Sequence, residues 1–170
     1  IADRLAALGC PKEKISMVRL GAPVPLKDQL RKVSSDTVKI VCVASLLPVK
    51  GHRYLIDAFG KAYTKVPKLR LTLIGDGPER QAIEVQIQRN QLSKAVTLKG
   101  WLTSEKVQDE LRKADIYAQA SYRYIYDGNT AMSEEGLPIS MVEAAAYGIP
   151  IIGTDSGGIK EICHDKINGC

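Results

Sequence analysis

The sequence has no long apolar run, and this scarcity bears on where the protein works. No stretch approaches the roughly eighteen consecutive apolar residues of a membrane-spanning helix. The first residues also lack the basic and then apolar order of a secretion signal. We therefore expect a soluble, cytoplasmic protein that contacts the inner face of a membrane at most.

Histidine is scarce as well, and the cysteines follow no recognisable spacing. Only two histidines are present, which excludes a metal site built from several of them. The four cysteines lie far apart and form neither a CxxC redox pair nor a zinc-finger spacing. The sequence predicts buried free thiols in a reducing compartment and no bound metal.

The marks of a nucleic-acid-binding protein are also missing. The net charge is +5 and the pI is near 9.0, but Lys and Arg are scattered, and the chain has one Trp and one Phe. The positive field suits an anionic ligand or an anionic membrane surface, and equally a plain solvated exterior. What the 170 residues do hold is the composition of a globular domain, 45% hydrophobic and 25% charged.

Apolar β-branched runs alternate with longer amphipathic segments from residue 38 onward. The runs fall at 38–44, 69–74, 96–99, 116–120 and 151–154, and helical patterns fill the gaps. Apolar strands separated by helices are typical of a parallel sheet covered on both faces. The sequence predicts an α/β fold, a Rossmann-like doubly wound parallel sheet.

The first 36 residues follow a different pattern. Residues 1–12 resemble the end of a helix closed by Gly9 and Pro11, residues 15–20 a short strand, and residues 21–36 a linker containing prolines. The chain also begins without Met and stops after a turn-like segment. We expect residues 1–36 to be the end of a preceding domain with an interdomain linker. Residues 37–170 would be a nucleotide-sugar-binding domain, truncated at its C-terminal end.

Ligands of such sheets bind beyond the carboxyl ends of the strands, so the loops there are the candidate site. The loop after the fourth run holds Glu135 and leads through a proline into a helix that carries Glu143 eight positions later. Free backbone amides around Ile139, Ser140 and Met141 would form an anion site that suits a diphosphate. The two carboxylates would accept sugar hydroxyls, or would be a solvated loop residue and a helix-surface charge.

Other loops hold candidates with two interpretations each. Lys50, after the first run, suits either a phosphate contact or plain exposure. Gly75 and Gly77 suit either a tight strand-to-helix turn or the approach of backbone to a ligand. Trp101 suits either a nucleobase contact or the end of the core, and the glycine-rich segment 155–161 either a turn or a second phosphate-facing loop.

These pieces occur in one order, and in that order the sequence resembles the C-terminal, donor-binding domain of the retaining GT-B glycosyltransferases of family 4 (glycosyl transferases group 1). The resemblance spans most of residues 15–170. It is carried by Leu46-Leu47-Pro48-Val49-Lys50-Gly51, Leu73-Ile74-Gly75-Asp76-Gly77-Pro78, Ala114-Asp115-Ile116, Glu135-Gly136-Leu137-Pro138 with Glu143-Ala144, Gly148-Ile149-Pro150 and Gly157-Gly158-Ile159-Lys160-Glu161.

The resemblance implies roles for these residues. Lys50 and Glu135 would be the catalytic pair, Lys50 on the donor diphosphate and Glu135 on the transferred sugar, while Glu143 would hold the ribose hydroxyls. Further donor contacts would come from Ser45, Gly75, Gly77, Trp101, Gly136, Ile139, Ser140 and Met141. The resemblance also implies a UDP- or GDP-sugar as donor substrate, no cofactor, no obligatory metal and retention of anomeric configuration.

Two departures from the family pattern stand out. The family usually has an Arg at the position of Ser45, so either Lys50 carries the charge alone or Arg53 or Arg123 moves in. The loop 122–134, rich in Tyr, Asp and Gly, resembles an insert of members that build bacterial exopolysaccharide or lipopolysaccharide. Its tyrosines either touch the sugar or the acceptor, or belong to a mobile surface loop.

The implied function is hexosyl transfer from a nucleotide sugar to a saccharide or lipid-linked acceptor in bacterial polysaccharide or lipopolysaccharide synthesis. Transfer would occur in the cleft between this domain and an N-terminal domain of the same chain, so the isolated fragment is expected to be inactive. Two alternatives stay open: a sugar-nucleotide epimerase of GT-B fold and a non-catalytic nucleotide-binding domain. No nucleic-acid partner is expected.

Overall fold

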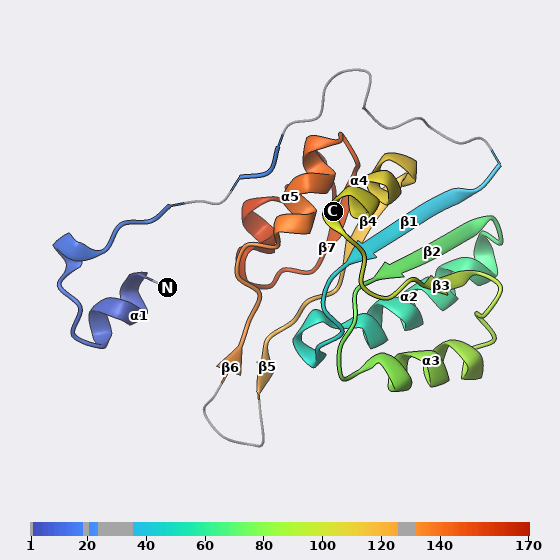
Figure 1. Cartoon of the computed structure of the whole chain (residues 1–170), viewed down its shortest axis with the longest axis horizontal. Coiled ribbons are helices and arrows are strands. Elements are labelled where there is room, and N and C mark those ends of the chain that lie inside the picture. Colours follow the sequence, from blue (N-terminus) through green and yellow to red (C-terminus); the bar gives the residue numbers. More distant parts are fainter. Residues whose placement is uncertain (1, 19–20, 24–35, 126–131) are drawn as a thin grey trace.

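Five parallel strands form the centre of the molecule. The computed structural model describes residues 2–18, 21–23, 36–125 and 132–170, and the sheet has the order β3-β2-β1-β4-β7 (Figure 1). The strands are β1 (Val38–Val43), β2 (Leu69–Ile74), β3 (Val96–Leu98), β4 (Ile116–Gln119) and β7 (Ile151–Gly153). Each lies within one of the apolar runs, so the predicted Rossmann-like sheet is confirmed.

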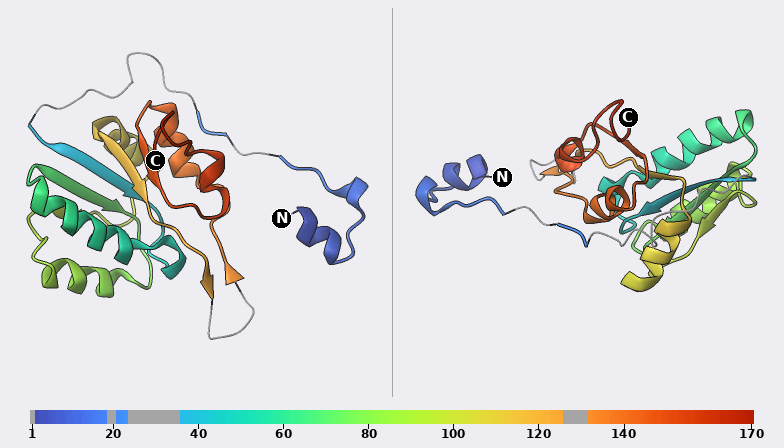
Figure 2. Two further views of the ribbon diagram at one scale, coloured as in Figure 1. Left: turned by 180° about the vertical axis from the view of Figure 1, so that it is seen from behind. Right: turned by 90° about the horizontal axis from the view of Figure 1, so that it is seen from above.

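Helices cover both faces of this sheet (Figure 2). One face carries α2 (His52–Lys65) and α3 (Arg80–Arg89), and the other carries α4 (Ser104–Lys113) and α5 (Ile139–Ala146). Neighbouring side chains of β1 enter two different hydrophobic clusters: Cys42 packs with Ile56 of α2, and Val41 with Leu111 of α4. Burial on both faces explains why the strands are apolar at nearly every position.

The strand order reverses beside the central strand β1. From β1 the chain proceeds to β2 and β3 on one side, and then crosses to β4 and β7 on the other. The strand β4 pairs directly with β1 through Ile40↔Ile116 and Val41↔Tyr117. Loops diverge at such a reversal and leave a crevice between them, so the loops after β1 and β4 are where this topology favours a ligand.

The segment before β1 matches the predictions in part. The helix α1 (Ala2–Ala7) ends before Gly9, whose φ of 94° suits a glycine at a helix end. Residues 15–18 form no strand, so the strand predicted at 15–20 is wrong over its described part; no described strand lies alongside to accept its backbone hydrogen bonds. Most of the predicted linker, residues 24–35, lies outside the described residues.

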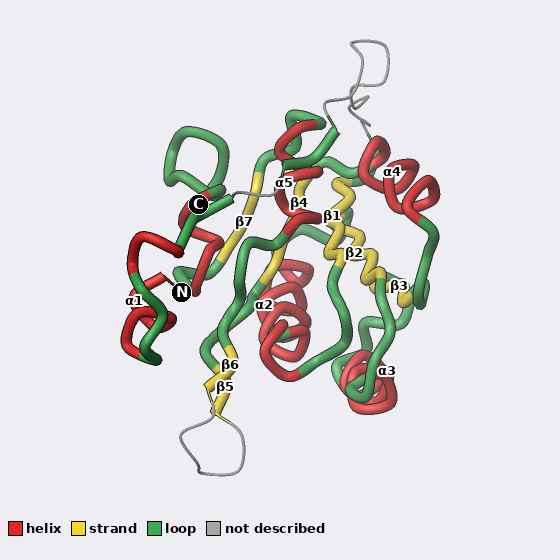
Figure 3. Tube along the Cα trace, turned by 60° about the vertical axis from the view of Figure 1, so that its left-hand side comes forward, coloured by secondary structure: helices red, strands yellow, loops and turns green. Residues whose placement is uncertain are grey.

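The loop after β4 contains two short strands that pair with each other. The strand β5 (Tyr124–Ile125) pairs antiparallel with β6 (Met132–Ser133) and projects from the sheet beyond the carboxyl ends of its strands (Figure 3). Residues 126–131 lie outside the described part of the chain. The described ends of this insert are therefore ordered by pairing.

The cysteines, the possible metal ligands and the character of the helices can be compared with the predictions. All four cysteines are free, but only Cys42 is buried, so the prediction of buried thiols holds for that one residue. No group of three or more His, Cys, Asp or Glu in the described ranges could hold a metal ion. No helix in these ranges has both the length and the apolar character needed to cross a membrane.

Candidate functional site

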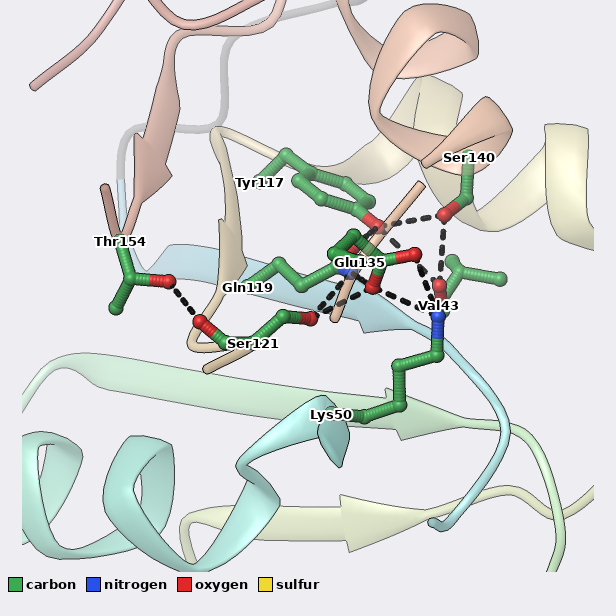
Figure 4. Close-up of polar contacts among 8 residues, drawn as sticks. All are labelled: Val43, Lys50, Tyr117, Gln119, Ser121, Glu135, Ser140 and Thr154. Carbon is green, nitrogen blue, oxygen red and sulfur yellow. Dashed lines mark hydrogen bonds and ion pairs between the residues drawn. The ribbon is translucent and has the colours of Figure 1, made fainter. Parts of the chain in front are cut away.

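A lysine and a glutamate meet where β1 and β4 end. The Lys50 ammonium donates hydrogen bonds of 2.7 Å to both carboxylate oxygens of Glu135 (Figure 4). Their side chains are 21% and 6% exposed, so the pair is largely shielded from water. The interpretation of Glu135 as a solvated loop residue is therefore wrong, because its burial is supported by a paired cation.

Lys50 owes its position to the loop between β1 and α2. It ends a 3-10 turn (Pro48–Lys50), and Gly51 follows in the left-handed region at φ 65° before α2 begins. The backbone N–H of Tyr122, after β4, donates to the Val49 carbonyl at 3.0 Å. This bond ties the two loops together and brings Lys50 toward the Glu135 side of the crevice.

Glu135 is supported from behind by the segment after β7. The Gly158 N–H donates to the carbonyls of Glu135 and Gly136, at 3.2 and 3.0 Å. A Cβ at Gly157, which has φ 52°, would lie 1.9 Å from the Glu135 carbonyl oxygen. The glycines of segment 155–161 therefore allow two loops to pack closely, which favours the turn interpretation of this segment.

Two further side chains hold the Glu135 carboxylate. Its Oε2 accepts hydrogen bonds from Gln119 Nε2 at 2.8 Å and from Ser121 Oγ at 2.7 Å. Both donors are buried, Gln119 at 2% exposure and Ser121 at 0%. Our sequence analysis missed them, although polar residues at the end of an otherwise apolar strand are a usable signal, since buried polar groups need partners.

A buried tyrosine extends this network to the start of α5. The Tyr117 hydroxyl lies 2.8 Å from Gln119 Oε1 and 2.7 Å from Ser140 Oγ, and Ser140 Oγ lies 2.7 Å from the Val43 carbonyl oxygen (Figure 4). Burial raises the pKa of Tyr117 well above its ordinary value, so the hydroxyl keeps its proton and can donate it. Tyr117 was also missed, because a Tyr in a strand is ordinarily a core residue.

The helix α5 starts at Ile139, directly after Pro138, and is the helix expected after this proline. The amides of Ile139 and Ser140 precede the first closed turn and have no backbone acceptor among the described residues. Met141 differs: its N–H donates to the Pro138 carbonyl at 3.0 Å, and its side chain is fully buried in the core. The prediction that Met141 offers a free amide to an anion is therefore wrong.

Glu143 lies one turn inside α5 and is half-buried. No side chain in the described part of the chain bonds its carboxylate. Burial raises its pKa above the ordinary value for Glu, and no cation offsets this. A partly desolvated carboxylate with no protein partner has free capacity to accept hydrogen bonds from a ligand.

Gly75 and Gly77 lie under the loop that follows β1. A Cβ at Gly75 would come within 2.0 Å of the Ala44 carbonyl oxygen, and one at Gly77 within 2.6 Å of that of Leu46. The Leu46 N–H in turn donates to the Asp76 carbonyl at 2.9 Å. These contacts favour the tight-turn interpretation of the two glycines.

The remaining candidates are exposed around this edge. Trp101 follows β3 and is 73% exposed, so the interpretation that places it at the end of the core is wrong. Ser45 is exposed on the loop after β1, and Gly136 is exposed with open space where a side chain would be. All three have surface that a ligand could reach.

Neither of the two candidate replacements for the missing Arg contacts Glu135. The Arg53 guanidinium bonds the Tyr54 hydroxyl at 2.6 Å and stacks over its ring, 4.6 Å from the centroid. Arg123 lies 3.6 Å from a carboxylate oxygen of Glu134. Within the described ranges Lys50 is the one cation that contacts Glu135.

The Glu135 loop also forms part of a pocket of about 490 Å³. The pocket is lined by residues 134–137, by Gly157 and Gly158, and by residues 15–18 of the N-terminal segment. Its volume is of the size that small-molecule ligands occupy. Glu135 therefore lines a space that can accept a ligand, while Lys50 is not among the residues that line it.

Comparison with known proteins identifies relatives of this chain. A family model described as "Glycosyl transferases group 1" matches residues 27–170. The chain is 31% identical over 169 residues to WcaL of Escherichia coli K12, whose name assigns it to colanic acid biosynthesis as a glycosyltransferase. It is 30% identical over 167 residues to the amylovoran biosynthesis glycosyltransferase AmsK of Erwinia amylovora. The matches cover 99% and 98% of this chain but only 40% of each relative.

Solved structures share the fold at low sequence identity. Staphylococcus aureus TarM, solved with UDP and saccharides, superposes with a TM-score of 0.80 at 20% identity over 98% of this chain and 30% of its own. Anabaena HepE, solved with UDP and glucose, gives a TM-score of 0.78 at 20% identity, over 99% of this chain and 45% of its own. At this identity the likeness shows the Rossmann-like fold of GT-B glycosyltransferases and nothing finer.

Proposed function

Because the chain belongs to the glycosyl transferases group 1 family, we propose that it is the donor-binding C-terminal domain of a retaining GT-B glycosyltransferase of family 4. The observation that carries the proposal is the Lys50–Glu135 pair at the strand-order reversal, beside the free start of α5. The substrate class is a nucleoside-diphosphate sugar, from which a hexose is transferred.

The diphosphate would bind between Lys50 and the first turn of α5. The free amides of Ile139 and Ser140 and the positive end of the helix dipole suit a phosphate. Negative charge develops on the leaving diphosphate as the glycosidic bond breaks. A fixed ammonium and fixed amides stabilise that charge without having to reorganise.

The two carboxylates would hold the two sugars of the donor. Glu135 lies next to Lys50 and accepts a hydroxyl of the transferred hexose, while Glu143, inside α5, accepts the ribose hydroxyls. The exposed indole of Trp101 offers a face to the nucleobase. Ser45, Gly75, Gly77 and Gly136 shape the surrounding loops.

The comparisons support a UDP- or GDP-sugar as the donor. The solved structures of TarM and HepE hold UDP, while another relative, from Mycolicibacterium smegmatis, is named a GDP-mannose-dependent mannosyltransferase. The names of WcaL and AmsK place similar chains in bacterial exopolysaccharide synthesis. A saccharide or lipid-linked acceptor would then face this domain across the cleft.

Calorimetric titration with UDP, GDP, ADP and their sugar conjugates tests the proposal by measuring the affinity for each ligand. We expect one base to bind, with Lys50→Ala and Glu143→Ala each weakening that ligand about tenfold or more. Lys61→Ala and Glu105→Ala remove the same charges from exposed positions of α2 and α4 and serve as matched controls. The proposal fails if no nucleotide binds at millimolar concentration, or if all four variants bind like the parent protein.

A further inference from the structure

The buried amide of Gln119 can take only one orientation. Its Nε2 lies 2.8 Å from Glu135 Oε2 and 2.9 Å from Ser121 Oγ, and its Oε1 lies 2.8 Å from the Tyr117 hydroxyl. A carboxylate only accepts hydrogen bonds, so the NH₂ group must face Glu135. The opposite orientation would place a carbonyl oxygen against the carboxylate and leave both without a donor.

This orientation sets the direction of the hydrogen bond between Tyr117 and Gln119. Gln119 Oε1 accepts, so the Tyr117 hydroxyl donates to it. The Ser140 hydroxyl has one proton and two acceptors at 2.7 Å, the Val43 carbonyl oxygen and the Tyr117 oxygen. The donors therefore run in sequence from Tyr117 through Gln119 to Glu135, and each bond polarises the next.

The two oxygens of Glu135 therefore have different environments. Oε2 accepts from Gln119, Ser121 and Lys50, whereas Oε1 is bonded by Lys50 alone. If Lys50 turns to a phosphate, Oε2 keeps two donors and Oε1 loses its one partner. The side chain then stays in place with one oxygen free.

We propose that Gln119 is a positioning residue that fixes Glu135 Oε2, so that Oε1 is the oxygen offered to the donor sugar. The inference rests on the function proposed above, in which Glu135 contacts the transferred hexose and Lys50 the diphosphate. Tyr117 acts one step further back by locking the Gln119 amide. It also links the sugar side of the site to Ser140 at the diphosphate side.

The test separates binding of the sugar from binding of the nucleotide. Dissociation constants are measured for UDP against UDP-glucose and for GDP against GDP-mannose. The ratio within the pair that binds gives the contribution of the sugar. The variant is Gln119→Met, which keeps an unbranched side chain of similar length but removes the amide. Thr72→Val changes a half-buried polar residue of the neighbouring strand β2 and serves as the control.

We expect Gln119→Met to lower the ratio five- to tenfold while the affinity for the nucleoside diphosphate alone changes less than twofold. Tyr117→Phe should lower the ratio two- to threefold, and Thr72→Val should leave it unchanged. A Gln119→Met protein that keeps the parent ratio overturns the inference. So does one that loses both affinities equally, because Gln119 would then support only the fold.

Three other results remain decisive. If Gln119→Met does not fold, as judged by circular dichroism and thermal melting, Tyr117→Phe decides, and an unchanged ratio there overturns the inference. If the parent protein binds the nucleoside diphosphate but gains nothing from the sugar, Glu135 does not contact it and the inference is wrong while donor-site binding stands. If the parent binds no nucleotide, the proposed function itself has failed.

Discussion

Lys50 and Glu135 form an ion pair in which one ammonium bonds both carboxylate oxygens at 2.7 Å. Such a pair is locally neutral, so Glu135 competes with any phosphate for the same ammonium. Under the proposed function, Lys50 has to exchange a carboxylate for a diphosphate when the donor binds. The carboxylate it leaves is still held by Gln119 and Ser121.

Removing the charge of Glu135 should therefore separate the two parts of the donor. In Glu135→Gln the ammonium of Lys50 has no competing anion, and we expect UDP or GDP alone to bind about two- to fivefold more tightly. The sugar conjugate should lose its advantage over the nucleoside diphosphate, because the hydroxyl acceptor has changed. Calorimetric titration of both ligands measures the two effects.

The neighbouring Glu134→Gln is the control for this prediction. Glu134 is exposed and carries the same charge one position earlier. If both variants tighten nucleotide binding equally, general electrostatics and not the Lys50 pair is responsible. Weaker nucleotide binding in Glu135→Gln would contradict the competition outright.

The five strands and the start of α5 could be predicted from the sequence, and the Lys50–Glu135 pairing could not. Strands buried on both faces have apolar runs in the sequence, and a proline before an apolar periodic segment is a local signal for the start of a helix. Lys50 and Glu135 are 85 positions apart, and their contact depends on how two loops are tied across the sheet. The sequence indicates each residue as a candidate, but an ordinary exposed side chain is an equally acceptable interpretation of each.

Glycines and the first helical turn show a second limit of the sequence. Gly75 and Gly157 are required because a Cβ at either position would strike backbone atoms. Those atoms belong to a loop that is distant in the sequence. Met141 was expected to have a free amide, but the Pro138 carbonyl lies within reach of it. Gln119 lies in an otherwise apolar strand, and its bond to Glu135 depends on how the fold brings the loop after β4 back to that strand.

The close packing behind Glu135 predicts a large cost for one methyl group. In Gly157→Ala the added Cβ would lie 1.9 Å from the Glu135 carbonyl oxygen, at a residue whose φ is 52°. Gly148→Ala is a matched control, because Gly148 has φ 69° but nothing within 4 Å of the added Cβ. The control should lose about 1 kcal/mol of unfolding free energy from backbone strain alone.

Gly157→Ala should lose at least about 2 kcal/mol more than this control, because the Glu135 loop has to shift. Urea denaturation of both variants measures the difference. Nucleotide-sugar affinity should fall only in Gly157→Ala. Equal losses of stability in the two variants would show that the loops tolerate the methyl group and that the contact does not position Glu135.

The burial of His52 should make the free energy of unfolding depend on pH. Its side chain is fully buried at the first position of α2, and neither ring nitrogen has a hydrogen-bond partner among the described residues. Burial, and secondarily the charge of Lys50, lower the pKa of His52 from 6.5 to about 4. Between these values the unfolded chain binds a proton that the folded chain does not.

The stability should therefore fall as the pH drops from about 6.5 to about 4, by up to about 3 kcal/mol from this residue. His52→Leu should remove that part of the slope and change the stability at pH 7 little, because no hydrogen bond is lost. Denaturation curves across this pH range measure it, with His164→Leu, at an exposed histidine, as the control. An unchanged acid slope in His52→Leu would mean that other groups dominate.

Glu143 predicts opposite effects on stability and on binding. Burial raises its pKa in the folded protein, so above its unfolded pKa the charged form opposes folding. Glu143→Gln removes that charge, and we expect the melting temperature at pH 7 to stay the same or rise slightly. The difference from the parent should vanish as the pH falls below the ordinary range of a carboxylate.

The same variant should bind the nucleoside diphosphate about tenfold more weakly, because a ribose hydroxyl loses an anionic acceptor. A variant that is destabilised and binds nucleotide normally would assign Glu143 a structural role in α5 and take the ribose contact away from it.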